Sequence, residues 1–171
     1  MKSYSIKKGS HYSSKGLFER LGAICCNVKT FSVRFKFHTD CYWAPARNAD
    51  DYDLNKLTGM GFGLNLHKNS VRLAWVPDFD VAGTIKIYGY TYDEKKVDPK
   101  FTFLYITSVT VEQICEAKIE SKGDKYTITV NKIAVEMDNM HKDPKICFRL
   151  FPYFGGNNTA PKDMAIEIEY L

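Results

Sequence analysis

The stretch FSVRFKF, Phe31 to Phe37, decides the fold class of this chain. Its four apolar residues alternate with a serine, an arginine and a lysine, so one face is apolar and the other is polar. A period of two is the pattern of a β-strand that buries one face and leaves the other in water. The stretch therefore predicts a strand packed on one side of a core.

The same pattern recurs along the chain, in runs separated by turn signals such as Pro77-Asp78 and Asp143-Pro144. The runs are SVRLAWV (70–76), TIKIYGYTY (84–92), FTFLYIT (101–107), KYTITV (125–130), KIAVEM (132–137), KICFRLF (145–151) and MAIEIEY (164–170). Such spacing is typical of an antiparallel sandwich or barrel. We expect an all-β protein with few short helices. LFERLGAICC (17–26) predicts one helical turn, and TVEQICEAKIE (110–120) fits either a helix or a strand.

Composition limits the class of protein. The 171 residues suit a single domain, residues 1–171, and a hydrophobic content of 44% argues against disorder. A net charge of +4 is too small for a dedicated nucleic-acid binder, and no apolar run is long enough to span a membrane. We therefore expect neither nucleic acid nor membrane as a partner. Several lysines near the start predict an extended basic arm over residues 1–16, either solvated or docked on an acidic partner.

The five cysteines predict reduced thiols. Their number is odd and no C-x-x-C pair occurs, which argues against a disulfide framework and against a zinc site. The first residues also lack the apolar stretch of a signal peptide, which fits a protein made in the cytosol. Cys147 lies in a strand pattern, where a buried thiol behaves as a small hydrophobe. We expect no metal and no cofactor.

Three segments carry a resemblance to a known group of proteins. They are IKKGSHYSS (6–14), DLNKLTGMGFGLNLHKNSVRLAW (53–75) and LFPYFGGNNTAPKDMAIEIEY (150–170). Together they resemble small single-domain proteins of crAss-like phages and related Bacteroidales genomes. The resemblance implies a β-sandwich of jelly-roll type, similar in outline to concanavalin-like lectin and lyase domains. It also implies a role in a virion or its assembly, because jelly rolls often serve as capsid, collar and fibre modules.

The loop before the last strand supports the sandwich and leaves a second use open. In a sandwich, this loop crosses from one sheet to the other. Gly155 and Gly156 would supply positive φ angles, and Pro161 would fix the entry to the strand. The pair Tyr153 and Phe154 would cap the core. The alternative is a loop that grips a ligand.

The region from Cys41 to Lys68 shows no clear strand period, so we expect the longest loops there, and loops of that length often carry function. Its run GMGFG (59–63) lacks the order of a phosphate-binding loop and indicates a flexible loop or a glycine-rich strand edge. A cluster of Asp50, Asp51 and Asp53 lacks the glycine pattern of a calcium loop.

His67 is the most interesting histidine. Sandwich-fold polysaccharide lyases use a histidine and a tyrosine for proton transfer beside a uronate, with an arginine and an amide neutralising the carboxylate. His67, Tyr88 or Tyr90, Arg72 and Asn69 could form such a set. The competing interpretation, which we favour at this stage, is a loop histidine that makes local hydrogen bonds.

A tyrosine ladder is a stronger lead. Tyr88, Tyr90 and Tyr92 share one face of a strand, where exposed rings could stack on sugars and buried rings would pack in a core or a subunit interface. Glu167 and Glu169 also share a face, which we interpret as a solvated outer surface rather than a glycosidase pair. The ligand or interface candidates are Asn65, His67, Lys68, Asn69, Tyr88, Tyr90, Tyr92, Tyr153, Asn157 and Asn158.

The sequence contains no nucleophile motif, so we name no catalytic residue. The leading hypothesis is a non-enzymatic structural component of a phage virion, such as a tail or neck ring, a collar or a fibre module. Its partners would be other virion proteins and copies of itself in a homo-oligomer, and its location a virion assembled in the host cytoplasm. The alternative is a carbohydrate-binding module that uses exposed tyrosine rings. A polysaccharide lyase or hydrolase is a third, less favoured hypothesis.

Overall fold

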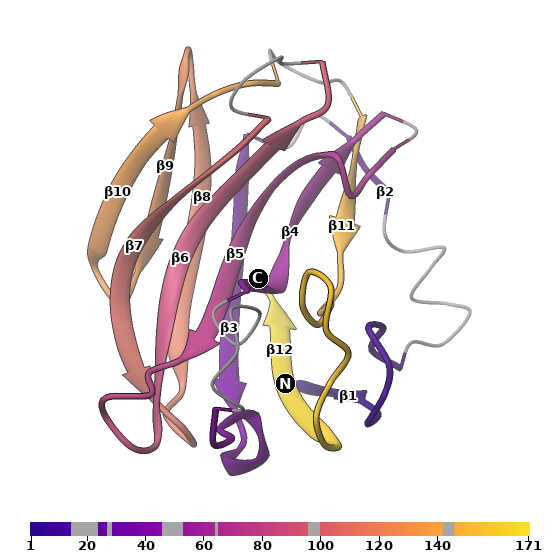
Figure 1. Ribbon diagram of the computed structural model, residues 1–171. Helices are drawn as coiled ribbons and strands as arrows, with labels where there is room; N and C mark the ends of the chain where they lie inside the picture. Colours follow the sequence, from indigo (N-terminus) through magenta and orange to yellow (C-terminus); the bar gives the residue numbers. More distant parts are fainter. Residues whose placement is uncertain (15–23, 27–28, 46–52, 64, 96–99, 142–145) are drawn as a thin grey trace.

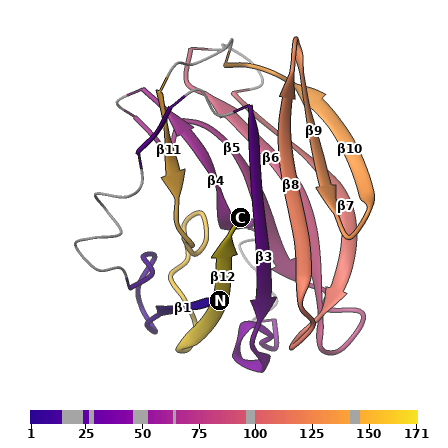
Figure 2. The same cartoon turned by 180° about the vertical axis from the view of Figure 1, so that it is seen from behind.

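Twelve strands in the described part of the chain form two six-stranded antiparallel sheets, packed face to face as a sandwich (Figures 1 and 2). The computed structural model describes all residues except 15–23, 27–28, 46–52, 64, 96–99 and 142–145. The all-β jelly-roll sandwich predicted from the sequence is confirmed.

The front sheet, nearest the viewer in Figure 1, has the strand order β2-β11-β4-β5-β6-β7. Its strands are β2 (Ile24–Cys26), β11 (Ile146–Leu150), β4 (Asn55–Phe62), β5 (Asn69–Pro77), β6 (Thr84–Asp93) and β7 (Phe101–Thr110). The back sheet, nearest the viewer in Figure 2, has the order β1-β12-β3-β8-β9-β10. Its strands are β1 (Lys2–Ile6), β12 (Met164–Tyr170), β3 (Thr30–Phe37), β8 (Cys115–Lys122), β9 (Lys125–Val130) and β10 (Ile133–Asp138).

The core lies between the sheets, where the apolar faces of the alternating strands meet. Phe35 and Phe37 of β3 are 0% and 1% exposed, and Trp75 of β5 is 0% exposed. The Phe37 and Trp75 rings join the two sheets, with centroids 4.9 Å apart. Complete burial of one large apolar side chain stabilises a fold by about 1.5–3 kcal/mol. The period-two pattern therefore decides the fold because one face of each strand must leave water.

The strand β4 corrects the prediction of a long loop between Cys41 and Lys68. GMGFG lies inside β4 or at its end, and β4 pairs with β11 on one side and β5 on the other, so it is not at a sheet edge. A Cβ on Gly59 would collide with the backbone of Val71 and Arg72 on β5. Close approach of two strands requires glycine here. The same glycines remove the side chains whose alternation would have revealed the strand.

Other segments also differ from the expectation. Residues 2–6 of the expected N-terminal arm form the edge strand β1, paired with β12. TVEQICEAKIE contains no helix; Glu112 has a φ of 65° in the turn after β7, and β8 begins at Cys115. The one helix among the described residues is the short 3-10 turn η1 (Thr39–Cys41), so none of them forms a helix that could cross a membrane. Most of LFERLGAICC lies outside the described residues.

The loop between β11 and β12 turns the corner from the front sheet to the back sheet, as predicted. Gly155 has a φ of 72°, while Gly156 is not in the left-handed region. The Gly155 amide donates to Oδ1 of Asn55 at 2.6 Å. The amide of Asn157 donates to Oδ2 of Asp53 at 3.2 Å. These bonds fix the loop against the beginning of β4, beside the outer face of the front sheet.

The described thiols agree with the prediction of reduced cysteines. Cys41, Cys115 and Cys147 are buried thiols that form no disulfide. Burial raises the pKa of the Cys41 thiol, and the neighbouring Asp40 carboxylate adds to this effect. A thiol with a raised pKa is a weak nucleophile, because the thiolate is the reactive form. These cysteines therefore act as packing residues.

Candidate functional site

A groove with a volume of about 620 Å³ lies on the outer face of the front sheet. We call it the front groove. Strands β6 and β7 provide much of its lining, and segments around residues 53–56, 77–80 and 156 provide the rest. Its described lining consists of Asp53, Leu54, Lys56, Val76, Pro77, Phe79, Asp80, Lys86, Tyr88, Tyr90, Tyr92, Phe101, Phe103 and Gly156.

The strand register brings basic and aromatic residues together on this face. Arg72 of β5 is paired with Gly59 of β4 and with Tyr90 of β6, and Tyr90 is paired with Phe103 of β7. Paired residues on antiparallel strands project from the same face of the sheet. These four residues, one from each of β4, β5, β6 and β7, therefore form a row across the outer face of the sheet.

Arg72 is a buried cation, 2% exposed. Its Nε donates to Oγ of Ser70 at 3.1 Å, and its Nη2 donates to the Leu66 carbonyl at 3.2 Å. No carboxylate of the described residues lies within ion-pair distance of it. Burial lowers the pKa of Arg72 to about 10, although Tyr90 and Tyr153 oppose that shift. A buried charge without a counter-charge is costly and marks a functional-site candidate.

His67 is exposed and lies within reach of this arginine. Its Nδ1 is 3.4 Å from Nη2 of Arg72. Because a guanidinium has only donors, Nδ1 must accept, and the proton of the neutral imidazole is then on Nε2. The His67 ring centroid is also 5.1 Å from that of Tyr153. The sequence-based pairing of His67 with Arg72 is therefore realised.

Tyr153, in the loop after β11, is half-buried in an aromatic cluster. The His11 ring stacks on it at 5.4 Å, and the Tyr12 ring meets it edge-on at 5.3 Å. Burial raises the pKa of Tyr153, and Tyr12 adds to the rise, while Arg72 acts in the opposite direction. Tyr153 therefore keeps its proton at neutral pH, which a proton donor requires.

Lys56 lies next to Tyr153, because their backbones exchange two hydrogen bonds of 2.8 and 2.9 Å. Its Nζ donates to the Leu54 carbonyl at 2.7 Å and stands 5.1 Å from the centroid of the Tyr90 ring. No described carboxylate is within ion-pair distance of Nζ. Burial, and then repulsion by Arg72, lower the pKa of Lys56 to about 8, and Asp53 offsets part of the shift. An amine with this pKa is close to the range of a general base.

Two rows of aromatic rings cover the β6–β7 side of the groove. Tyr88, Tyr90 and Tyr92 of β6 are paired with Tyr105, Phe103 and Phe101 of β7, respectively. Phe101 and Phe103 are 48% and 50% exposed, whereas Tyr90 is 8% exposed. The tyrosine ladder therefore projects from the outer face of the sheet, and the rings of β7 remain available in the single chain.

Several other sequence-based candidates lie apart from this arrangement. The side-chain amides of Asn65 and Asn69 donate to Glu94 at 3.0 and 2.8 Å, so Asn69 does not complete the set around His67. Lys68 and Asn157 are exposed, and neither they nor Asn158 line the front groove. Asp50 and Asp51 fall outside the described residues, and within those residues no group of three acidic, histidine or cysteine side chains could hold a metal.

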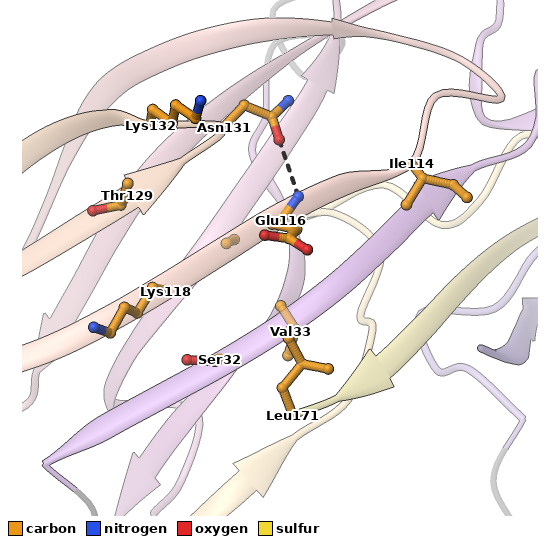
Figure 3. Close-up of a pocket in the computed structure, with 10 residues that line it drawn as sticks. Ser32, Val33, Ile114, Glu116, Lys118, Thr129, Asn131, Lys132 and Leu171 are labelled. Atoms are coloured by element: carbon orange, nitrogen blue, oxygen red, sulfur yellow. Dashed lines mark hydrogen bonds between the residues drawn. The ribbon is translucent and has the colours of Figure 1, made fainter.

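A second hollow, of about 580 Å³, lies on the back sheet over β3, β8 and β9 (Figure 3). Its polar groups are largely engaged. Glu116 accepts from Nε of Arg34 at 2.9 Å, and its amide donates to Asn131 at 3.0 Å. Lys118 is 2.9 Å from Glu120. Because these charged groups on the back sheet already pair with one another, they have less need of a ligand. The front groove is therefore the better candidate for a ligand-binding site.

Sequence reasoning missed Lys56 and the position of Tyr153. Lys56 lies in the glycine-rich strand β4, which has no visible period, and Tyr153 was expected to cap the core. In the structure Phe154 takes that role, at 4% exposure and 5.4 Å from the Trp43 ring. Alternation along the aromatic run would have placed Tyr153 and Phe154 on opposite sides.

The solved structures with a similar fold include alginate lyases and a glucanase. The alginate lyase AlyC3 matches with a TM-score of 0.62 and 11% identity, over 99% of this chain and 74% of that chain. The alginate lyase vAL-1 from Chlorella virus matches with a TM-score of 0.54 and 14% identity, over 98% and 81%. SCLam, a non-specific endo-β-1,3(4)-glucanase from family GH16, matches with a TM-score of 0.53 and 15% identity, over 84% and 56%. At these identities the likeness shows the fold alone. No protein-family model and no curated protein sequence matches the chain.

These findings correct two expectations. A non-enzymatic structural component of a virion was wrong as the leading hypothesis, because the matching structures named above are two alginate lyases and a glucanase. The expectation that the protein is not an enzyme was wrong for the same reason. Jelly rolls serve both classes of protein, so fold resemblance was too coarse to separate them. The concanavalin-like jelly roll implied by the resemblance is confirmed.

Proposed function

We propose that this protein binds an acidic polysaccharide in the front groove and cleaves it by β-elimination. The observation that carries the proposal is the buried guanidinium of Arg72, which has no carboxylate partner among the described residues and lies beside Lys56, His67 and Tyr153. A negative ligand would supply the missing counter-charge. The alginate lyases among the structural neighbours support a uronate-containing substrate.

Each of the four side chains has a role that follows from its environment. Arg72 and the Nε2–H of His67 neutralise the uronate carboxylate, which makes the proton on the neighbouring carbon more acidic. Lys56, with its lowered pKa, takes that proton from carbon 5 as the neutral amine. The electron pair forms a double bond between carbons 4 and 5, and the glycosidic bond at carbon 4 breaks. Tyr153 gives its proton to the leaving oxygen.

The positions of base and acid suit this reaction. Lys56 and Tyr153 are backbone-paired neighbours, so a proton can leave and enter from adjacent side chains on one side of the sugar. Of the four side chains, Lys56 lines the groove itself, and Arg72, His67 and Tyr153 lie next to Lys56, outside the described lining. The aromatic rings of β6 and β7 extend the binding surface away from Lys56.

The test is an assay of the purified protein against alginate, polygalacturonate and glucuronate-containing polysaccharides, followed by the ultraviolet absorbance of the unsaturated product. We expect absorbance to rise with the wild-type protein and to be lost with His67→Ala. The matched control is Lys68→Ala, because Lys68 is the exposed neighbour of His67, whereas it is the His67 ring that contacts Arg72 and Tyr153. Loss of activity in both variants, or in neither, would contradict the assignment.

A second candidate function is carbohydrate binding without cleavage, which the exposed rings of β7 favour. Phe101 and Phe103 offer faces on which sugars can stack. Retention of the protein on an acidic glycan resin, with no unsaturated product formed, would select this function. The relation to crAss-like phage and Bacteroidales proteins, a homo-oligomer and the location in a virion stay predictions that the groove does not test.

A further inference from the structure

We infer that the glycan bound in the front groove carries its acidic sugars singly, next to neutral sugars, rather than as an unbroken run of uronates. This inference rests on the proposed function and narrows its substrate class. The reason is that cations and aromatic rings occupy different parts of the groove, so the two parts select different sugars.

The unpaired cations lie on the β4–β5 side. Lys56 lines the groove from β4, and Arg72 of β5 lies beside it, outside the described lining, where its charge lowers the pKa of Lys56. The only other described ammonium in the lining belongs to Lys86, which is 3.0 Å from Asp78 and 3.7 Å from Asp80. Lys86 is thus already neutralised. A single carboxylate at the Lys56 side would find a counter-charge, and further carboxylates in the described lining would not.

The β7 part of the groove, lined by Phe101 and Phe103, is unsuited to a carboxylate. Phe101 and Phe103 offer ring faces without a hydrogen-bond donor, and they are about half exposed, at 48% and 50%. The face of an aromatic ring is the negative side of its quadrupole, which attracts C–H groups and repels anions. A carboxylate held against these rings would also lose water without gaining a partner. The apolar face of a neutral pyranose has neither cost.

One oligosaccharide can occupy the β4–β5 side and the β6–β7 side of the groove at the same time. Neighbouring strands lie about 4.8 Å apart, so the three intervals from β4 to β7 span roughly 14 Å. This width places different sugars of one oligosaccharide over Lys56 and over Phe103. The carboxylates of Asp53 and Asp80 also line the groove, and they further disfavour a ligand with a negative charge on every sugar.

The experiment compares two classes of oligosaccharide of equal length by isothermal titration calorimetry. The homopolymers are alginate and polygalacturonate oligomers, and the alternating or mixed polymers are oligomers of hyaluronan, heparosan and gellan. The variant Tyr153→Phe, whose cleavage should be slow, keeps the ligands intact during the titration. We expect the best mixed oligomer to bind at least tenfold more tightly than either homopolymer. Equal or tighter binding of a homopolymer would overturn the inference and leave the proposed function standing.

A pair of variants tests the aromatic side separately. Phe103→Leu removes the ring but keeps an apolar side chain, and we expect it to weaken the mixed oligomer roughly tenfold and to leave homopolymer binding unchanged. Leu104→Ala is the control, because Leu104 is paired with Gly89, faces the other side of the same strand and is 46% exposed. Equal losses for both ligand classes in Phe103→Leu would also overturn the inference. Failure of every acidic oligomer to bind the folded protein would instead refute the proposed function.

Discussion

Basic side chains on the outer faces of the two sheets differ in whether they have carboxylate partners. On the back sheet, Arg34 is 2.9 Å from Glu116 and 3.6 Å from Glu169, and Lys36 is 3.1 Å from Glu167. On the front sheet, Arg72 and Lys56 have no described carboxylate within ion-pair distance and are more deeply buried. Both sheets have the same architecture, so the fold does not require this difference.

The difference indicates which face has a function. Exposed ion pairs contribute little to stability and keep a surface soluble. A buried cation without a partner costs free energy in the empty protein, and a bound anion would remove that cost. The charges of the back sheet therefore have partners, whereas the front sheet has a buried cation, Arg72, that a negative ligand could pair with, beside an amine, Lys56, whose pKa is lowered to about 8. The predictions below test this contrast, from the largest expected effect to the smallest.

Loss of the proposed acid gives the largest effect. Tyr153→Phe keeps the ring but removes the hydroxyl, so the rate of cleavage should fall by roughly 10²–10⁴-fold, the usual contribution of a general acid. The affinity for the glycan should change little. Initial rates of absorbance increase and calorimetric dissociation constants measure the two quantities. A variant that keeps its rate would remove Tyr153 from the mechanism.

Loss of the buried cation should separate activity from stability. Arg72→Met should reduce cleavage roughly 10²–10³-fold, because it removes a preorganised positive charge. It should leave the melting temperature unchanged or raise it, because an apolar side chain avoids the cost of burying a charge. Thermal denaturation and the absorbance assay are the measurements. A strongly lowered melting temperature would mean that Arg72 serves the fold.

The pH dependence should report the lowered pKa of Lys56. The neutral amine is the base, so its fraction, and with it the cleavage rate at saturating substrate, should rise about tenfold per pH unit up to about pH 8 and then level off. Burial lowers the pKa of Lys56 most, Arg72 lowers it further and Asp53 opposes the shift, while the Tyr90 ring faces Nζ at 5.1 Å. Lys56→Arg, which cannot deprotonate in this range, should be inactive throughout.

A control for the pH experiment is available in the same groove. Lys86→Arg keeps a charge beside Asp78, so its rate profile should follow that of the wild-type protein. A wild-type profile that is flat across pH 8 would contradict the role of Lys56 as the base.

The smallest effect is expected on the back sheet. Arg34→Met breaks the contacts with Glu116 and Glu169, yet it should change neither glycan binding nor cleavage measurably. The melting temperature should shift little, since Arg34 is exposed to water. Calorimetry and thermal denaturation check both statements. A loss of cleavage activity comparable to that of Arg72→Met would remove the distinction between the two faces.

The sequence predicted the fold better than the site, for physical reasons that particular residues illustrate. The residues from Phe31 to Phe37 predict a strand, because burial of one face of a strand requires an apolar residue at every second position. The strand β4 could not be predicted in the same way, because Gly59 and Gly61 have no side chains and so interrupt its pattern of alternation. The meeting of His67 with Arg72 could be proposed because they are five residues apart across one turn. Tyr153 joins them only through the register of distant strands, which no local pattern encodes.

The most direct test of the contrast between the faces is a backbone-amide NMR titration of Tyr153→Phe with a short acidic oligosaccharide. We predict that the amides of the front sheet around Gly59, Arg72 and Tyr90 shift on binding. Amides of the back sheet around Lys118 and Asn131 should stay in place. Shifts confined to the back sheet, or no saturable shifts in the folded protein, would contradict the account.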